Sequence, residues 1–271
     1  MKIECVFILS VSSDIGQALA LEYLNDGCEV IGTYRNRESV VDLEKRPGMQ
    51  LLYCDIASVE SIRSMIIDYG SLSKPWGVFI SSVGTLEPIG PFFSQDFDSW
   101  EQSVTVNSIA QLRVLRELYA FRQRGRISHA VFFAGGGINN PFTNYSAYTA
   151  SKVFLVKMCE LLDDENQDLN VFIVGPGFRP TKIHNQTINN PYGAGDNLER
   201  TFGFLRSERP QTSFRDIYHC INWCIAQGKS VAGGRNFSVV RDHWLEDAQL
   251  VEQLQRDRNK FKLRRFRNEE R

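Results

Sequence analysis

The chain has 271 residues, of which 42% are hydrophobic and 23% are charged, and its formal net charge is −1. These values fit a globular protein with a sizeable core, and they give no overall attraction to nucleic acid or to an acidic membrane. Its six cysteines form no Cys-x-x-Cys pair and only four histidines are present. The sequence therefore predicts no metal site and no disulfide framework.

The amino-terminal segment predicts a strand, not an export signal. Residues 1–9 are apolar but lack a basic leader and a small-residue cleavage site. No apolar run approaches the ~18 residues that a membrane helix needs. We therefore expect a cytoplasmic protein with reduced, buried thiols and no membrane partner.

Short apolar runs alternate with helical patterns along most of the chain. The predicted strands are residues 5–9, 29–33, 51–55, 78–82, 128–134, 170–174 and 236–240. The main predicted helices are residues 17–25, 40–45, 59–69, 100–121, 145–162 and 213–227. Continuous apolar strands that alternate with helices are typical of a parallel sheet covered on both sides. The predicted fold class is α/β, a Rossmann-type doubly wound parallel sheet with helices on both faces.

We expect one dinucleotide-binding and catalytic domain, residues 1–245, followed by a tail. Residues 182–210, called the flap below, are rich in Asn, Gly and Pro, and they predict a mobile cover over a site, with short helices. Residues 246–271 predict a charged helical tail, either solvated or docked on a neighbouring subunit. Its last sixteen residues, 256–271, hold eight Lys or Arg against three Asp or Glu.

Tyr148 and Lys152 lie four residues apart in a helical pattern, so their side chains share one helix face. A lysine cation held close to a phenol favours the phenolate, and we therefore expect the pKa of Tyr148 to be lowered. Such a tyrosine can exchange a proton with a substrate oxygen. The alternative is an ordinary amphipathic helix with a buried tyrosine and a solvated lysine.

A turn of small residues connects the first strand to the first helix. A strand, a small-residue turn and a helix together present backbone N–H groups and a positive helix end to a phosphate. Asp14 would place a carboxylate near a pyrophosphate unless it points away or caps the helix. The candidate phosphate-binding residues of this turn are Ser10, Ser12, Ser13, Asp14, Ile15 and Gly16.

Over about residues 3–240 these motifs, in this order, resemble the single-domain branch of the short-chain dehydrogenases/reductases. The pair Tyr148 and Lys152 matches the family's active-site pair, and Asn107 matches its active-site asparagine. The resemblance implies that Tyr148 is the general acid, that Lys152 lowers its pKa and binds the nicotinamide ribose, and that Asn107 holds a proton-relaying water. Further cofactor contacts that it implies are Asp55 and Ile56 at the adenine, Ser82 and Gly84 after the fourth strand, and Pro176, Gly177 and Thr181 at the nicotinamide end.

The chain departs from the family pattern at three places. The three glycines of the family's turn align with Ser10, Asp14 and Gly16, and the Asn-Asn-Ala-Gly motif after the fourth strand is Ser-Ser-Val-Gly at residues 81–84. The family's active-site serine aligns with Gly135, which has no side chain to hold a substrate carbonyl. Either a neighbouring donor replaces the serine or activity is weak. The candidate donors are Thr143, Asn139, Asn140 and the backbone of the glycine run, and His184 is a further candidate substrate contact.

The residues after the second strand predict the cofactor. NAD-binding sites usually carry an acid there, but this chain has Tyr-Arg-Asn-Arg at residues 34–37. Arg35 or Arg37 can pair with the 2′-phosphate of NADP, so we expect NADP(H) to be preferred over NAD(H). The alternative is that both arginines are simply solvated.

The main hypothesis is an NADP(H)-dependent oxidoreductase that acts on a carbonyl or secondary alcohol, with a polar flap that favours a sugar-type substrate. A second hypothesis is a non-catalytic NAD(P)-binding sensor or scaffold, suggested by the altered turn and Gly135. A third is a sugar-nucleotide epimerase or dehydratase, for which the region after the sixth strand leaves little room. The resemblance also implies a homodimer or homotetramer that packs through residues 100–121 and 145–162.

Overall fold

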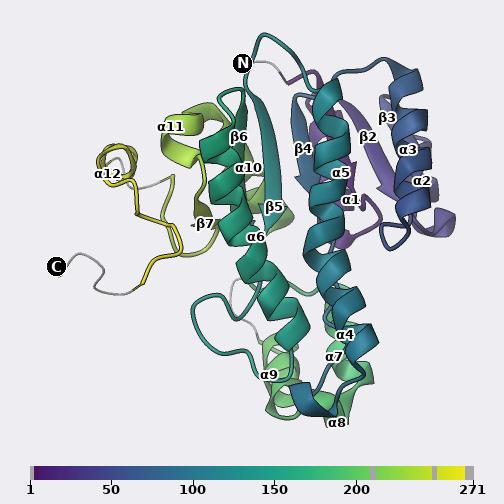
Figure 1. The fold of residues 1–271 in the computed structure, drawn as a ribbon, viewed down its shortest axis with the longest axis vertical. Coiled ribbons are helices and arrows are strands. Elements are labelled where there is room, and N and C mark those ends of the chain that lie inside the picture. Colours follow the sequence, from purple (N-terminus) through teal and green to yellow (C-terminus); the bar gives the residue numbers. More distant parts are fainter. Residues whose placement is uncertain (1–2, 208–211, 246–248, 266–271) are drawn as a thin grey trace.

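A computed structural model describes residues 3–207, 212–245 and 249–265. Its centre is a seven-stranded, fully parallel sheet with the order β3-β2-β1-β4-β5-β6-β7 (Figure 1). The strands are β1 (Cys5–Leu9), β2 (Glu29–Tyr34), β3 (Met49–Tyr53), β4 (Val78–Ser81), β5 (Ser128–Phe133), β6 (Leu169–Gly175) and β7 (Asn236–Ser238). The predicted fold class is confirmed.

Helices cover both faces of the sheet, and alternate residues of each strand enter two separate cores. On β1, Val6 and Ile8 pack toward one face, while Phe7 and Leu9 pack toward the other. The first core lies under α1 (Asp14–Asn25), α10 (Phe214–Gln227), α11 (Lys229–Ala232) and the short pair η1 (Arg37–Val40) and α2 (Val41–Glu44). The second lies under α3 (Val59–Leu72), α5 (Ala110–Leu118) and α6 (Ser146–Glu165), which Figure 1 shows across one face of the sheet.

The strand order reverses between β1 and β4, which lie side by side although β2 and β3 intervene in the sequence. In an open parallel sheet, the connections that leave two such strands turn to opposite faces, and a crevice forms beyond their carboxyl ends. The turn before α1 and the loop after β4 begin at this point. The topology therefore places the candidate phosphate-binding turn beside the residues that follow β4.

The segment predicted as one helix over residues 100–121 is interrupted. It consists of α4 (Phe97–Val104), a π-helical turn η3 (Thr105–Ile109), α5 and a 3₁₀ turn η4 (Tyr119–Phe121). A π-helical turn leaves backbone carbonyls outside the regular ladder. The buried side chain of Gln111 donates to two of them, Val106 O (3.2 Å) and Asn107 O (2.7 Å), while Ser81 Oγ donates to its amide oxygen.

The described part of the flap is helical. It contains α7 (Ile183–Asn189), α8 (Pro191–Ala194) and α9 (Asp196–Leu205), while residues 208–210 lie outside the described residues. Figure 1 shows these helices together at one end of the molecule, near α4 and the first turns of α6. A short 3₁₀ turn, η2 (Phe92–Ser94), precedes α4.

The tail differs from the expected charged helix. It forms one short helix, α12 (Leu250–Arg256), and the chain from 257 to 265 is not helical; residues 246–248 and 266–271 lie outside the described residues. Leu250 and Leu254 are buried against the first core, so the tail docks on its own chain. The buried guanidinium of Arg235 binds it by donating to the Lys260 and Asp257 carbonyls. The tail packs on its own chain because Leu250 and Leu254 bury their side chains in the first core and the buried cation of Arg235 bonds the tail's carbonyls.

Candidate active site

The turn between β1 and α1 closes tightly although its first position is not glycine. Ser10 has a left-handed backbone (φ 65°), and its N–H donates to Thr33 Oγ1 at 2.8 Å. Ser82 Oγ lies 2.9 Å from the Ser10 carbonyl, so the residue after β4 ties down this turn. A Cβ on Gly16 would lie 2.6 Å from the Ser10 oxygen, and only glycine therefore permits this close approach.

Asp14, which opens α1, does not cap its own helix. Ser13 is the N-cap, and its Oγ accepts from the N–H of Gly16 at 3.0 Å. The Asp14 carboxylate instead accepts from the N–H of Lys182, at the start of the flap, at 2.6 Å. Its other oxygen lies 3.7 Å from Lys182 Nζ. Asp14 therefore does not cap the helix, and the first residue of the flap holds its carboxylate instead.

The ends of β2 and β3 carry the candidate contacts for the adenine half of a dinucleotide. Arg35 is exposed and has no polar partner among the described residues, whereas Arg37 pairs with Glu44 at 2.5 Å. Asp55 follows β3 and accepts from the N–H of Ala57 at 3.1 Å, and Ile56 beside it is half-buried. Arg35 is therefore the arginine that is available to a ligand.

Tyr148 and Lys152 lie on one face of α6, as their spacing predicts. Lys152 Nζ lies 5.6 Å from the centre of the Tyr148 ring and 3.4 Å from the Val83 carbonyl after β4. Burial lowers the pKa of Lys152 to about 8 and raises the pKa of Tyr148 to about 12. The prediction of a lowered tyrosine pKa is wrong for this structure, because desolvation favours the neutral form of both groups.

Asn107 is fully buried within the π-helical turn, and its amide group pins the loop after β4. Its oxygen accepts from the N–H of Thr85, and its nitrogen donates to the Thr85 carbonyl, both at 2.9 Å. The nitrogen also reaches Ser103 Oγ at 3.2 Å. Sequence reasoning missed Thr85, whose only signal was its place directly after Gly84.

The flap covers the site through contacts with two loops, the one after β4 and the one before α6. Gln186 accepts from the N–H of Leu86 at 2.7 Å, and Thr187 Oγ1 lies 2.8 Å from Tyr145 Oη. Asn197 donates to the Thr143 carbonyl at 2.9 Å. Polar flap residues that were expected to face a substrate are thus used to hold the flap, a role that the sequence did not indicate.

The side chains between the flap and α6 are apolar. Tyr148 is 9% exposed and belongs to a small buried cluster that also contains Leu86, Ile89, Tyr145 and Ala194, with Phe142, Ile183 and Leu198 packed against it. A Cβ on Gly84 would lie 3.6 Å from Ile183 Cδ1, so α7 lies directly over the loop after β4. The phenol is therefore covered by the flap.

His184 is turned away from this cluster. Its Nε2 lies 2.9 Å from the Arg179 carbonyl, and its ring stacks on Phe178 at 5.5 Å. Burial lowers the pKa of His184, an effect that the hydrogen bond to Arg179 opposes. The Arg179 carbonyl takes this ring nitrogen, and a contact of His184 with substrate stays a prediction.

The loop after β6 leads from the sheet into the flap. Pro176 is half-buried, Gly177 has a left-handed backbone (φ 77°), and the Thr181 carbonyl accepts from the N–H of His184 at 3.1 Å. A Cβ on Gly177 would lie 2.5 Å from Thr212 Oγ1. The loop therefore needs a glycine there to pass close to the segment before α10.

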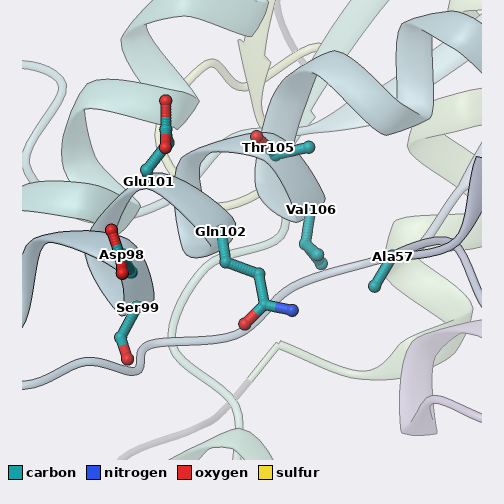
Figure 2. A pocket seen from close by; sticks show the side chains of 7 residues that line it. All are labelled: Ala57, Asp98, Ser99, Glu101, Gln102, Thr105 and Val106. Carbon is teal, nitrogen blue, oxygen red and sulfur yellow. The ribbon is translucent and has the colours of Figure 1, made fainter.

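An open cavity of about 410 Å³ lies elsewhere, between the outer side of α4 and the loop that contains Ala57 (Figure 2). It contains none of the predicted site residues. Five of the seven residues that line it have polar side chains; the lining residues are Ala57, Asp98, Ser99, Glu101, Gln102, Thr105 and Val106. No group of three or more metal-ligating side chains occurs within residues 3–207, 212–245 and 249–265. Over those same ranges no helix is long and apolar enough to cross a bilayer.

The family model that is described as short chain dehydrogenase matches residues 4–191, which include β1 through α7 and nearly every residue discussed above. The chain belongs to this family.

Curated relatives of this short chain dehydrogenase are distant. The 11-beta-hydroxysteroid dehydrogenase A of Sesamum indicum is 25% identical over 207 residues, which cover 71% of this chain and 56% of that protein. Serine 3-dehydrogenase of Rhizobium radiobacter is 21% identical over 232 residues, which cover 83% of this chain and 89% of that protein. The chain spans only 56–59% of the length of the first three curated relatives that it matches.

Solved structures share the fold. A short chain dehydrogenase/reductase of Saccharomyces cerevisiae superposes with a TM-score of 0.78 at 18% identity, and the match covers 92% of this chain and 98% of that one. At this identity the likeness shows the fold alone.

This short chain dehydrogenase has no room for a side chain at Gly135. A Cβ there would overlap the hydroxyl of Tyr148 and lie 2.7 Å from its Cε1. The donors considered as replacements for the serine, Thr143, Asn139 and Asn140, are exposed. No described hydrogen bond connects their side chains to the site. The phenol itself therefore occupies the space that a serine would need.

Proposed function

We propose that this chain is an NADP(H)-dependent oxidoreductase that transfers a hydride between NADP(H) and a carbonyl or secondary alcohol. The observation that carries the proposal is the position of Tyr148 and Lys152. They share one face of α6, with Lys152 bonded to the Val83 carbonyl at the carboxyl end of β4. This is the point beside the β1–α1 turn where an open parallel sheet binds ligands.

The residues around the turn fit a dinucleotide. Gly16 lets the turn close tightly, because a Cβ there would lie only 2.6 Å from the Ser10 oxygen, and α1 directs its N-terminal N–H groups toward the turn, as phosphate binding requires. Arg35 is exposed and unpaired among the described residues at the end of β2, which suits a 2′-phosphate. When bound, NADP(H) supplies or accepts the hydride.

The chain's own contribution is a proton at the substrate oxygen. With its pKa raised to about 12 by burial, Tyr148 is protonated at neutral pH, as the acid of a carbonyl reduction must be. Lys152, with its pKa lowered to about 8, still carries a proton in most molecules at pH 7. Its charge would stabilise the phenolate that remains after the proton leaves. Asn107 acts indirectly, by fixing the loop of Thr85.

The apolar cluster around Tyr148 supports a particular kind of substrate. Leu86, Phe142 and Ile183 surround the phenol, while the amides of Gln186 and Asn197 bind the backbone of neighbouring loops. A carbonyl compound with an apolar or aromatic group beside the carbonyl would bury that group here. A sugar would leave its hydroxyls without partners in the same cluster, so the geometry favours the apolar class.

The test is NADPH oxidation by the purified chain with a panel of apolar ketones, aromatic ketones and sugars, beside the Tyr148→Phe variant. We expect turnover with the apolar or aromatic members and a loss of about 10²- to 10⁴-fold in kcat in the variant. Equal, background-level rates for both proteins would reject the enzyme. Binding of NADPH without any turnover would instead support the sensor or scaffold alternative.

We also propose that two copies associate through the outer faces of residues 100–121, which include η3 and α5, and of residues 145–162, which form most of α6. Ile109, Phe154 and Leu161 are 40–45% exposed on this side of the molecule. Figure 1 shows the two helices next to each other on one face of the sheet. Light scattering during gel filtration tests this, and a monomer at micromolar concentration would contradict it.

A further inference from the structure

One charged contact joins the dinucleotide turn to the flap. Asp14 and Lys182 are 168 positions apart in sequence, yet the Asp14 carboxylate accepts from the N–H of Lys182 at 2.6 Å and lies 3.7 Å from its ammonium group. The Asp14 side chain is 23% exposed and that of Lys182 is 64% exposed, so solvent screens the charge pair, and the hydrogen bond from the Lys182 N–H is the stronger part of the contact. The first residue of α1 therefore holds the first residue of the flap.

The positive N-terminal end of α1 attracts a negative group, but a second negative group placed beside the first would be repelled by it. Asp14 is in the first turn of the twelve-residue helix α1, whose N-terminal end is positive. A dinucleotide pyrophosphate bound at the same end would bring negative charge close to the Asp14 carboxylate. The other flap contacts, from Gln186 to Leu86 and from Thr187 to Tyr145, join neutral groups and would not respond to that charge.

We propose that Asp14 is a latch that couples dinucleotide binding to opening of the flap. Without cofactor, the carboxylate holds Lys182, and α7 covers Tyr148 through Ile183 and its neighbours. An arriving pyrophosphate weakens that hold by repelling the carboxylate, and the flap is released as the cofactor binds. This inference rests on the proposed function, because it needs a dinucleotide at the turn.

A latch of this kind lowers the affinity for the cofactor. Part of the binding free energy is used to break the contact between Asp14 and Lys182, so the apparent Kd exceeds that of an open form. Removal of the carboxylate should therefore loosen α7 in the free protein and tighten dinucleotide binding. A carboxylate with a purely structural role would give the first effect without the second.

The experiment compares the wild type with Asp14→Ala, and with Asp14→Asn as a second variant that keeps an oxygen to accept from Lys182. Hydrogen exchange of residues 182–189 is measured without ligand, and the Kd of NADPH is measured by fluorescence titration. We expect Asp14→Ala to exchange faster in α7 and to bind NADPH about five- to tenfold more tightly. For Asp14→Asn we expect an intermediate exchange rate and tighter binding.

The matched control is Asp98→Ala, which removes an exposed carboxylate from the first turn of α4 without contact to the flap. It should change neither quantity. Unchanged exchange in α7, or an unchanged or weaker Kd, in Asp14→Ala would overturn the latch alone. Absence of dinucleotide binding by the wild type and all variants would overturn the proposed function itself.

Discussion

The hydroxyl of Tyr148 lies where a side chain at Gly135 would begin. A Cβ on Gly135 would overlap that hydroxyl and lie 2.5 Å from the ring carbon that carries it. The glycine and the buried position of the phenol therefore depend on each other. A serine could be accommodated at 135 only if Tyr148 moved, so the loss of the family's serine is linked to the place that its tyrosine takes.

The first prediction follows from this overlap. Gly135→Ala should lower the free energy of unfolding by about 1–3 kcal/mol, the usual cost of overpacking a buried site. In a Tyr148→Ala background the same substitution should cost almost nothing, since the ring is gone. Urea denaturation of the four proteins measures this. Gly203→Ala, in α9 with no atom near its Cβ, is the control and should be neutral or slightly stabilising. An equal cost of Gly135→Ala in both backgrounds would refute the overlap.

The second prediction concerns Lys152 and pH. Its pKa is lowered by burial from 10.5 to about 8, so between these values the unfolded chain binds a proton that the folded chain does not. The free energy of unfolding therefore rises with pH over that window. Below pH 8 the destabilisation caused by burying the Lys152 ammonium group is fully present. Lys152→Met should be more stable than the wild type at pH 7, by up to about 3 kcal/mol, and the difference should narrow toward pH 10.5.

Denaturation of wild type and Lys152→Met at several pH values measures that difference directly. The buried cysteines, such as Cys5 and Cys54, have raised pKa values and make stability fall as the pH rises through the ordinary thiol range. They are common to both proteins and cancel. Parallel stability curves for the two proteins would show that Lys152 keeps an ordinary pKa in the folded chain.

Much of the fold was predictable because its signals are local. Runs such as Cys5–Leu9 are apolar at every position, which predicts a strand buried on both faces, and the structure has it with the same bounds. The spacing of Tyr148 and Lys152 placed them on one helix face because helix geometry is fixed. Strand β3 begins at Met49, two residues before its expected start, since a strand's first residue is set by its neighbour β2.

The rest depends on contacts between distant segments. The sequence gives no sign that Asp14 meets Lys182, or that Asn107 and Gln186 converge on the loop of Thr85 and Leu86. The direction of the Tyr148 pKa was mispredicted because burial is a property of the packed flap, not of the helix that carries the residue. The spacing of apolar residues identified the helix that carries Tyr148, whereas the packing of the flap over it determines the pKa of that residue.

The third prediction separates the two arginines after β2. Arg35→Ala should weaken NADPH binding by about 10- to 100-fold, which is the loss of a charge-assisted hydrogen bond or two, and should leave NADH binding unchanged. Arg37→Ala is the matched control, because Arg37 is already paired with Glu44 and should affect NADPH by less than about threefold. Titrations with both dinucleotides decide. Equal weakening of NADPH and NADH by Arg35→Ala would mean that this arginine does not recognise the 2′-phosphate.

The fourth prediction concerns Arg235, which directly precedes β7 and hydrogen-bonds the backbone of the tail. Its guanidinium is buried, and burial lowers its pKa; it donates to carbonyls of both α11 and the tail, including Val231, Asp257 and Lys260. Arg235→Met should lower the free energy of unfolding by about 3–5 kcal/mol, since it leaves several buried carbonyls without donors. It should also speed hydrogen exchange at residues 250–265.

The control for Arg235 is another arginine of the same tail. Arg264 pairs with Glu160 at 2.5 Å, and that pair holds the pKa of Glu160 at about 2. The Arg264 side chain is 29% exposed and Glu160 keeps Lys157 as a second partner, so the cost of Arg264→Ala should be about 1–2 kcal/mol, below that of Arg235→Met. Urea denaturation compares the two variants. Similar costs for both would mean that the tail is held by surface charge and not by the buried cation.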